Sequence, residues 1–137
     1  MSSPVAASSY PRTTSTAVRW IGYALSAAAL LFLCFDISLK LALPPEAIKG
    51  TVDLGFEASI IRPLGVLQLA LLLLSVVPRT APLGAILWTG YLGGAVATHV
   101  RVDNPLFSHV LFPVYVAALL WSSLWIRDAR VRALLRR

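Results

Sequence analysis

The chain has 137 residues, of which 58% are hydrophobic and only 13% are charged, and its mean hydropathy is +0.77. Soluble domains carry about 25% charged residues, so this composition argues against a soluble domain and indicates a membrane protein of one compact domain. The chain has a net charge of +6, but five of its arginines fall in the last eleven residues, RDARVRALLRR. Basic residues next to an apolar segment are typical signals of membrane topology, so we expect no nucleic-acid binding.

The first 16 residues, MSSPVAASSYPRTTST, are rich in serine, threonine and proline and predict a disordered cytoplasmic segment. Four apolar stretches follow, over residues 18–42, 60–77, 82–101 and 105–126. Each is close to the roughly 20 helical residues that cross a bilayer core of about 30 Å. The first is longer than the apolar region of a signal peptide and has no clean cleavage site, so we interpret it as a retained helix.

The connections between these stretches predict how the helices run. PRTA and RVDN are tight turns, which make the helices on either side antiparallel neighbours. Pro63, Pro82 and Pro105 lie at helix starts, where a missing N–H costs nothing, and Asn104 is a candidate N-cap. Residues 44–59 are amphipathic in parts and predict an interfacial segment with a short helix over one end of the bundle. The predicted fold is all-α: an antiparallel bundle of four transmembrane helices over residues 17–127, followed by a basic cytoplasmic tail, 128–137.

Basic residues set the expected orientation, because cytoplasmic loops carry the excess of lysine and arginine. The side that holds both termini receives Arg12, Arg19, Arg79, Arg127, Arg130, Arg132, Arg136 and Arg137, and the other side receives Lys40, Lys49, Arg62 and Arg101. We therefore expect both termini in the cytoplasm and the chain in a bacterial plasma (inner) membrane.

Antiparallel packing brings most remaining ionisable residues to the extracytoplasmic end of the bundle. The candidate ligand-binding residues there are Asp36, Lys40, Arg62, Gln68, Thr98, His99, Arg101 and His109. Asp36 and Lys40 are four residues apart and can pair on one helix face, as can His99 and Asp103 if the third helix continues to 103. An ionisable group inside a membrane costs about 2.5–3.5 kcal/mol, so their convergence favours a pocket. Structural ion pairs, arginines that reach the headgroups and interhelical hydrogen bonds are the alternatives.

Two further patterns concern packing. Gly90, Gly94 and Thr98 share a helix face, which predicts a close-packed seam against a neighbouring helix. Pro113 is expected to bend the fourth helix and widen the adjacent half of the bundle.

The sequence contains no complete catalytic motif: C-x-x-C-H, P-loop, H-E-x-x-H and G-x-S-x-G patterns are all absent. The single cysteine, Cys34, cannot form an internal disulfide or a redox pair, and we expect it to be a small core residue. No metal site is expected, and whether the protein is an enzyme is left open.

The run GYLGGAVATHVRVDNPLFSHVLFPVY, residues 90–115, resembles the DoxX-like family of small four-helix membrane proteins, and RPLGVLQLALLLLSVVPRTAPLGAIL, residues 62–87, fits the same pattern. The resemblance implies a four-helix membrane fold without a settled activity. Related proteins have been linked to a terminal quinol oxidase, to thiosulfate:quinone oxidoreduction and to membrane complexes that manage oxidative stress.

Two functions are consistent with these observations. The first is a non-catalytic membrane module, that is, a scaffold, accessory subunit or small-ligand binder with a polar mouth at the extracytoplasmic end. The alternative is a quinone-linked redox accessory subunit of a membrane oxidoreductase complex, for which quinone is the candidate cofactor. The expected partners are the lipid bilayer and, for the alternative, a membrane oxidoreductase. The oligomeric state is left open, a homo-oligomer included.

Overall fold

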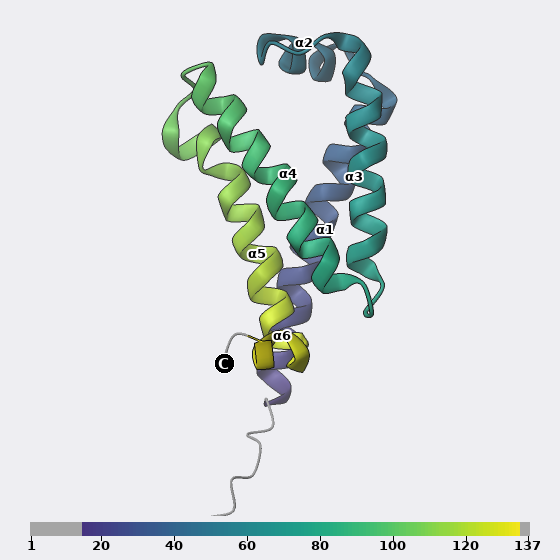
Figure 1. Cartoon of the computed structure of the whole chain (residues 1–137), viewed down its shortest axis with the longest axis vertical. Helices are drawn as coiled ribbons and strands as arrows, with labels where there is room; N and C mark the ends of the chain where they lie inside the picture. Colours follow the sequence, from purple (N-terminus) through teal and green to yellow (C-terminus); the bar gives the residue numbers. More distant parts are fainter. Residues whose placement is uncertain (1–14, 135–137) are drawn as a thin grey trace, which may run out of the picture.

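The computed structural model describes residues 15–134, and every regular element in that range is helical. Four long helices form an elongated bundle (Figure 1): α1 (Thr16–Ala42), α3 (Ile61–Val76), α4 (Ala81–Arg101) and α5 (Phe112–Arg127). The short helix α2 (Pro45–Asp53) lies across one end, which we call the α2 end. The short helix α6 (Ala129–Leu134) lies at the other end, the α6 end, where α1 begins. The prediction of an all-α fold is confirmed.

The predicted segments agree closely with the observed helices. α1, α3 and α4 begin and end within two residues of the predicted 18–42, 60–77 and 82–101, and α2 is the short helix expected within 44–59. The fourth segment is divided into a π-helical turn, η2 (Leu106–Val110), and α5, while a 3₁₀ turn, η1 (Ala58–Ile60), leads into α3. Almost all of the N-terminal segment expected to be disordered, 1–16, lies outside the described residues.

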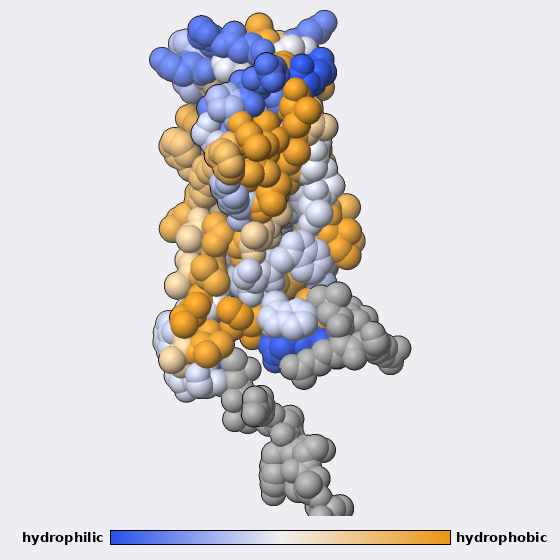
Figure 2. All heavy atoms as spheres, turned by 90° about the vertical axis from the view of Figure 1, so that its left-hand side faces the viewer, coloured by the Kyte–Doolittle hydropathy of each residue, from blue (hydrophilic) through white to orange (hydrophobic). Residues whose placement is uncertain are grey.

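The surface has the character of a membrane protein. Three helical stretches in the described range are long and apolar enough to cross a bilayer: Thr16–Ala42, Ala58–Val76 and Leu106–Arg127. Figure 2 shows hydrophilic residues gathered over the α2 end, with hydrophobic residues covering much of the length below it. Large apolar side chains such as Leu31, Leu73 and Phe107 point outward and are well exposed, which is costly in water and favourable against lipid.

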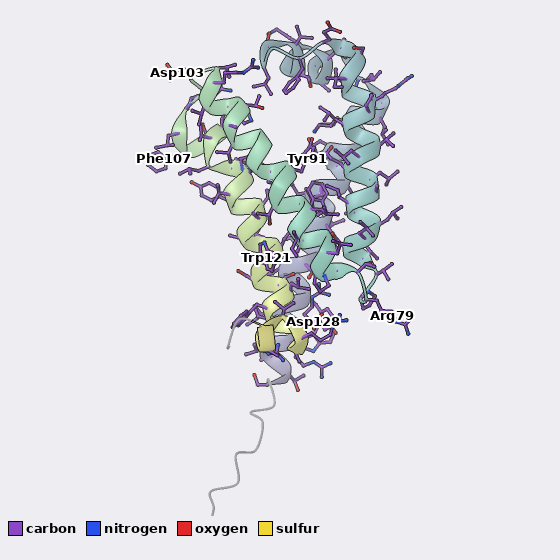
Figure 3. All side chains as sticks on the ribbon, viewed as in Figure 1. Arg79, Tyr91, Asp103, Phe107, Trp121 and Asp128 are labelled. Carbon is purple, nitrogen blue, oxygen red and sulfur yellow. The ribbon has the colours of Figure 1, made fainter. Side chains whose placement is uncertain are left out.

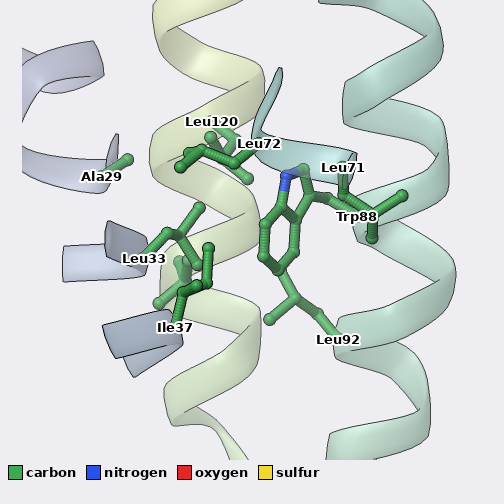
Figure 4. Packing of buried hydrophobic residues seen from close by; sticks show 9 residues of the cluster. Ala29, Leu33, Ile37, Leu71, Leu72, Trp88, Leu92 and Leu120 are labelled. Atoms are coloured by element: carbon green, nitrogen blue, oxygen red, sulfur yellow. The ribbon is translucent and has the colours of Figure 1, made fainter. Parts of the chain in front are cut away.

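The centre of the bundle is packed around Trp88, which is fully buried (Figure 4). Its indole ring lies among aliphatic residues of the other three long helices, namely Ala29, Leu33, Ile37, Leu71, Leu72, Val116 and Leu120, together with Leu92 of α4. Membrane helices gain little from the hydrophobic effect and depend on such close van der Waals packing. The packing around Trp88 therefore determines how the four long helices are arranged in the middle of the bundle.

Small residues mark the places where two helices approach most closely. A Cβ added at Gly22 would lie 2.7 Å from Ile126 Cγ2, and one at Gly84 would lie 2.9 Å from the backbone nitrogen of Ser75. Ser26 Oγ donates a buried hydrogen bond of 2.7 Å to Ser123 Oγ, joining α1 to α5. Close glycines and interhelical hydroxyl bonds are the usual means of holding membrane helices together.

The glycine stripe predicted as a packing seam is not one. A Cβ at Gly90 or at Gly94 would meet nothing within 4 Å, so no neighbouring helix packs against this face of α4 in the described chain. Cys34 is likewise not a core residue, because its side chain is exposed on the outside of α1. Both predictions were wrong because composition alone does not say which face of an apolar helix turns inward.

The connection from α4 to α5 also differs from the prediction. α4 ends at Arg101, and Asp103 has a φ of +54°, so the helix does not bring Asp103 onto the His99 face. Asn104 forms no side-chain cap on the next helix. Pro113 lies in the first turn of α5 rather than in the middle of a bent helix. The π turn ends just before it, and a first-turn residue needs no N–H for the helical hydrogen bonds.

At the α6 end, α6 folds back against the bundle. Val131 is buried with Ala81, Ala85 and Leu124, and Arg130 donates a hydrogen bond of 2.6 Å to the Pro78 carbonyl in the turn between α3 and α4. Arg130 also holds the pKa of Asp128 below its ordinary value, chiefly through side-chain hydrogen bonds to that carboxylate. Arg130 and Arg132 thus bind backbone carbonyls as well as carrying positive charge.

Candidate functional site

A cavity of about 850 Å³ lies at the α2 end, between α1, α3, α4 and α5 and beneath α2. We call it the α2 cavity. Its size is within the range of small-molecule sites, about 300–1,000 Å³. Its apolar walls include Phe32, Leu33, Phe56, Leu64, Phe112 and Val116. Its polar lining includes Asp36, Lys40, Thr51, Gln68, Tyr91, Thr98, His99, Asn104 and His109. This combination of apolar walls with a few polar groups is typical of a ligand site.

Three polar side chains from two helices meet in the lining of the cavity. Lys40 and Asp36 are one turn apart on α1, and Lys40 Nζ lies 2.5 Å from Asp36 Oδ2. This contact confirms the predicted ion pair. Gln68 Nε2 of α3 donates to the same oxygen at 2.7 Å. We call these residues the Asp36 cluster. Gln68 is seven residues inside α3, about 10 Å from the helix start at 1.5 Å per residue, so the cluster lies about two helical turns below the α2 end of α3.

The Gln68 carbonyl has an unusual environment. The residue is 2% exposed, and its Oε1 has no hydrogen-bond partner among the described residues. A carboxylate paired with an ammonium can only accept hydrogen bonds, so the amide must turn its NH₂ group toward Asp36. The free atom at this position is therefore the acceptor oxygen and not the nitrogen. Leaving a buried acceptor unpaired costs about 1–3 kcal/mol, so this oxygen lowers the stability of the cluster.

The two histidines meet at the opposite, α2-facing side of the cavity. The rings of His99 and His109 lie 5.8 Å apart in an edge-to-face arrangement. The π turn allows this contact, because it places His109 beside the last turn of α4. Asn104 Nδ2 lies 2.8 Å from His99 Nδ1; with the amide nitrogen as donor, His99 Nδ1 accepts and its remaining N–H is at Nε2. The side of the cavity nearest α2 therefore offers a hydrogen-bond donor.

Helix α2 forms the roof, and an arginine of α4 holds it there. Arg101 Nη2 donates a hydrogen bond of 2.6 Å to the carbonyl of Leu54, the C-cap residue that follows α2. Gly55 follows with a φ of +82°, and a Cβ there would lie 2.8 Å from the same Arg101 nitrogen. Glycine is thus favoured here by the backbone conformation, which residues with a Cβ rarely adopt. No residue of α2 is buried, and this hydrogen bond joins the end of α2 to α4.

The structure brings together most of the residues that the sequence singled out. Six of the eight candidates line the α2 cavity: Asp36, Lys40, Gln68, Thr98, His99 and His109. Arg62 is exposed and does not line it, and Arg101 acts on the roof instead. Figure 3 shows Tyr91 partway along α4, well below Asp103 at the α2 end and well above Arg79 in the opposite turn.

Tyr91 and Asn104 line the cavity and were not among the predicted site residues. A signal for Tyr91 was present, because positions 91 and 98 are seven apart and share a helix face with the candidate Thr98. No local signal marked Asn104, because its contact with His99 depends on how the α4–α5 connection folds.

Comparison with known proteins gives one match. The model of the DoxX-like family matches residues 24–123, a range that includes α2, α3, α4 and the whole lining of the α2 cavity. No curated protein and no solved structure gives a significant match to this chain.

Proposed function

The chain belongs to the DoxX-like family, and from that premise we propose that it is a non-catalytic membrane module that binds one small amphipathic molecule in the α2 cavity. The observation that carries the proposal is the α2 cavity itself, which has a volume of about 850 Å³, apolar walls and a few polar side chains. A scaffold that served only to dock a protein would not need such a cavity. A small-ligand binder needs one.

We further propose that all four long helices cross the membrane. α4 has 21 residues and a length of about 30 Å, enough for a bilayer core. It packs between α3 and α5, and the glycines on its cavity-facing side lower its hydropathy. The arginines at the α6 end favour a cytoplasmic location for that end of the bundle, with the α2 cavity facing the outside of a bacterial plasma membrane.

A cavity-filling substitution tests the binding function with a matched control on the same helix. Gly94 lines the cavity, Gly93 does not, and neither has an atom within 4 Å of an added Cβ. Gly94→Leu should therefore fill the cavity, while Gly93→Leu adds the same side chain elsewhere on α4. Native mass spectrometry of protein purified in mild detergent should show one retained small molecule per chain for the wild type and for Gly93→Leu, and none for Gly94→Leu. Identical spectra for all three proteins would contradict the proposal.

The histidine pair favours a second candidate function, a quinone-linked accessory subunit of a membrane oxidoreductase. His99 and His109 line the cavity and could donate hydrogen bonds to the carbonyls of a quinone ring that packs against Phe32 and Phe112, which line the same cavity. A bound quinone would supply the capacity to carry two electrons and two protons. If this function is correct, a His99→Ala, His109→Ala double variant should bind decylubiquinone more weakly and slow quinone-linked electron flow; wild-type behaviour in both would exclude it.

A further inference from the structure

We propose that the α6 end of the bundle binds the headgroup of an anionic phospholipid, and that Arg19 of α1 and Arg127 of α5 bind its phosphate beside the ring of Tyr23. The α6 end lies at the opposite end of the bundle from the α2 cavity (Figure 1). The lipid site is therefore separate from the proposed ligand site and does not depend on it.

Positive charge at the α6 end exceeds the negative charge that the same end provides. The part of the chain that the structure describes has one carboxylate there, Asp128, and five arginines: Arg19, Arg79, Arg127, Arg130 and Arg132. The carboxylate is already paired with Arg130, and Arg132 donates to two backbone carbonyls. Within residues 15–134, Arg19 and Arg127 form no ion pair. These two side chains are therefore available to an anion from outside the chain.

Arg127 is directed onto α1 by a close contact between two helices. A Cβ added at Gly22 would lie 3.1 Å from Cγ of Arg127, so the stem of this arginine crosses α1 at a glycine. Its Cζ atom lies 5.7 Å from the centre of the Tyr23 ring, a distance at which a guanidinium group and an aromatic face attract each other. The contact holds the guanidinium group over the surface of α1.

Arg19 belongs to the same surface. It precedes Tyr23 by four residues, about one helical turn, so the two side chains share a face of α1. Arg19 and Arg127 are both exposed, and Tyr23 is 47% exposed. Guanidinium groups of two helices are thus available to one ligand group that lies against Tyr23.

The surrounding side chains place this surface at the depth of lipid headgroups. Trp20 is 70% exposed and packs edge to face against Tyr23, with ring centres 6.2 Å apart, and Trp125 of α5 is also exposed. Exposed tryptophan and tyrosine are typical of the boundary between headgroups and acyl chains. Farther along α1, Ala27 and Leu31 are exposed and offer acyl chains an apolar surface. The anion present at this depth is the phosphate of a phospholipid, which a guanidinium group binds with two parallel hydrogen bonds.

A lipid with a net negative charge fits this surface better than a zwitterionic lipid. Phosphatidylcholine carries its phosphate beside a cationic amine, which the arginines repel. Phosphatidylglycerol carries its phosphate beside neutral hydroxyl groups. Each arginine without a carboxylate partner should therefore favour phosphatidylglycerol by about five-fold.

Competition between two lipids with identical acyl chains tests this site. Delipidated protein in maltoside micelles is mixed with equal amounts of dioleoylphosphatidylglycerol and dioleoylphosphatidylcholine, and native mass spectrometry counts the bound lipids. We expect the wild type to prefer phosphatidylglycerol at least about ten-fold. Arg19→Gln and Arg127→Gln should each lower that preference about five-fold. Arg19→Gln leaves the contact between Gly22 and Arg127 in place, so its effect does not depend on the packing of α1 against α5.

Arg79→Gln is the matched control. It removes the same charge from the turn between α3 and α4 at the same end of the bundle (Figure 3), and it should leave the preference unchanged. Equal binding of the two lipids to the wild type would overturn the proposal. An equal loss of preference in all three variants would also overturn it, because the lipid would then respond to total charge and not to a site beside Tyr23. A wild-type preference in Arg19→Gln or in Arg127→Gln would remove that arginine from the site and overturn the proposed pair.

Discussion

Replacement of Gln68 by leucine is expected to leave the stability of the ligand-free protein almost unchanged, although this side chain is 2% exposed and lies in the middle of the bundle. The substitution removes a hydrogen bond of 2.7 Å to the Asp36 carboxylate, and such bonds to charged groups contribute about 1.5–3 kcal/mol. It also removes a buried carbonyl oxygen without a partner, which costs about 1–3 kcal/mol. The two terms have opposite signs and similar size, so the free energy of unfolding should change by less than about 1 kcal/mol.

Asp36→Leu provides the comparison for this experiment. That change leaves the Lys40 ammonium, 19% exposed, without its carboxylate. Removing one partner of a buried ion pair costs about 3–5 kcal/mol, and partial exposure places Lys40 toward the lower end of that range. The two variants should therefore differ by at least about 2 kcal/mol, although both replace one polar residue of the same cluster by leucine.

The measurement is equilibrium unfolding of delipidated protein in mixed detergent micelles, followed by tryptophan fluorescence. A loss of more than about 2 kcal/mol in Gln68→Leu would refute the reasoning, because it would mean that the Gln68 carbonyl contributes to the stability of the empty protein. The Asp36 cluster would then be a structural centre whose polar groups are all hydrogen-bonded.

Three further predictions follow from separate contacts. Gly84→Ala should lower the free energy of unfolding by more than about 2 kcal/mol, because the added Cβ would lie 2.9 Å from a backbone nitrogen. Gly94→Ala, whose Cβ would meet nothing within 4 Å, should be neutral or slightly stabilising. Equal losses of stability for the two variants in a thermal unfolding assay would contradict this prediction. Arg101→Met should free the roof and speed amide hydrogen exchange in α2 at least about ten-fold, because it removes the bond to the Leu54 carbonyl, and unchanged exchange would mean that other contacts hold α2. Asp128, whose pKa is lowered by Arg130, should stabilise the protein at pH values above the ordinary pKa of aspartate, about 4. This contribution should be lost as the pH falls through the lowered pKa of Asp128. The thermal unfolding temperatures of wild type and Asp128→Asn should therefore converge at low pH, and a constant difference down to low pH would be inconsistent with the Asp128–Arg130 pair.

The helices could be predicted from sequence because long apolar stretches, flanking prolines and short turns are local signals. Residues 82–101 are bounded by Pro82 and by RVDN, and α4 begins and ends within one residue of them. The Asp36–Lys40 pair could be predicted for the same reason, since residues four apart on a helix are neighbours whatever the rest of the chain does.

The inward face of each helix could not be predicted, because the helices are apolar on all sides and have almost no hydrophobic periodicity. Gly94 was assigned to a packing seam and lines a cavity, while the close helix contacts use Gly22 and Gly84. Cys34 was placed in the core and lies outside it. In a soluble protein the polar face would have marked the outer surface, but lipid removes that contrast.

The site was predicted in part. His99 and His109 were both named from sequence, but the spacing argument paired His99 with Asp103, and the observed partner is Asn104. The π turn and the positive φ of Asp103 decide this contact, and neither has a reliable sequence signature. The bond between Gln68 and Asp36 joins residues 32 positions apart and depends on the register of α1 against α3.

The occupancy of the α2 cavity can be observed by determining the structure of the protein purified from its native membrane into lipid nanodiscs, with a bound antibody fragment to aid particle alignment. We expect one continuous density of a small molecule in the α2 cavity, between the Asp36 cluster and α2, and no such density in Gly94→Leu. A collapsed cavity, with α2 packed down onto Asp36, or a cavity that contains only the acyl chain of a bulk phospholipid, would contradict the proposed binding function.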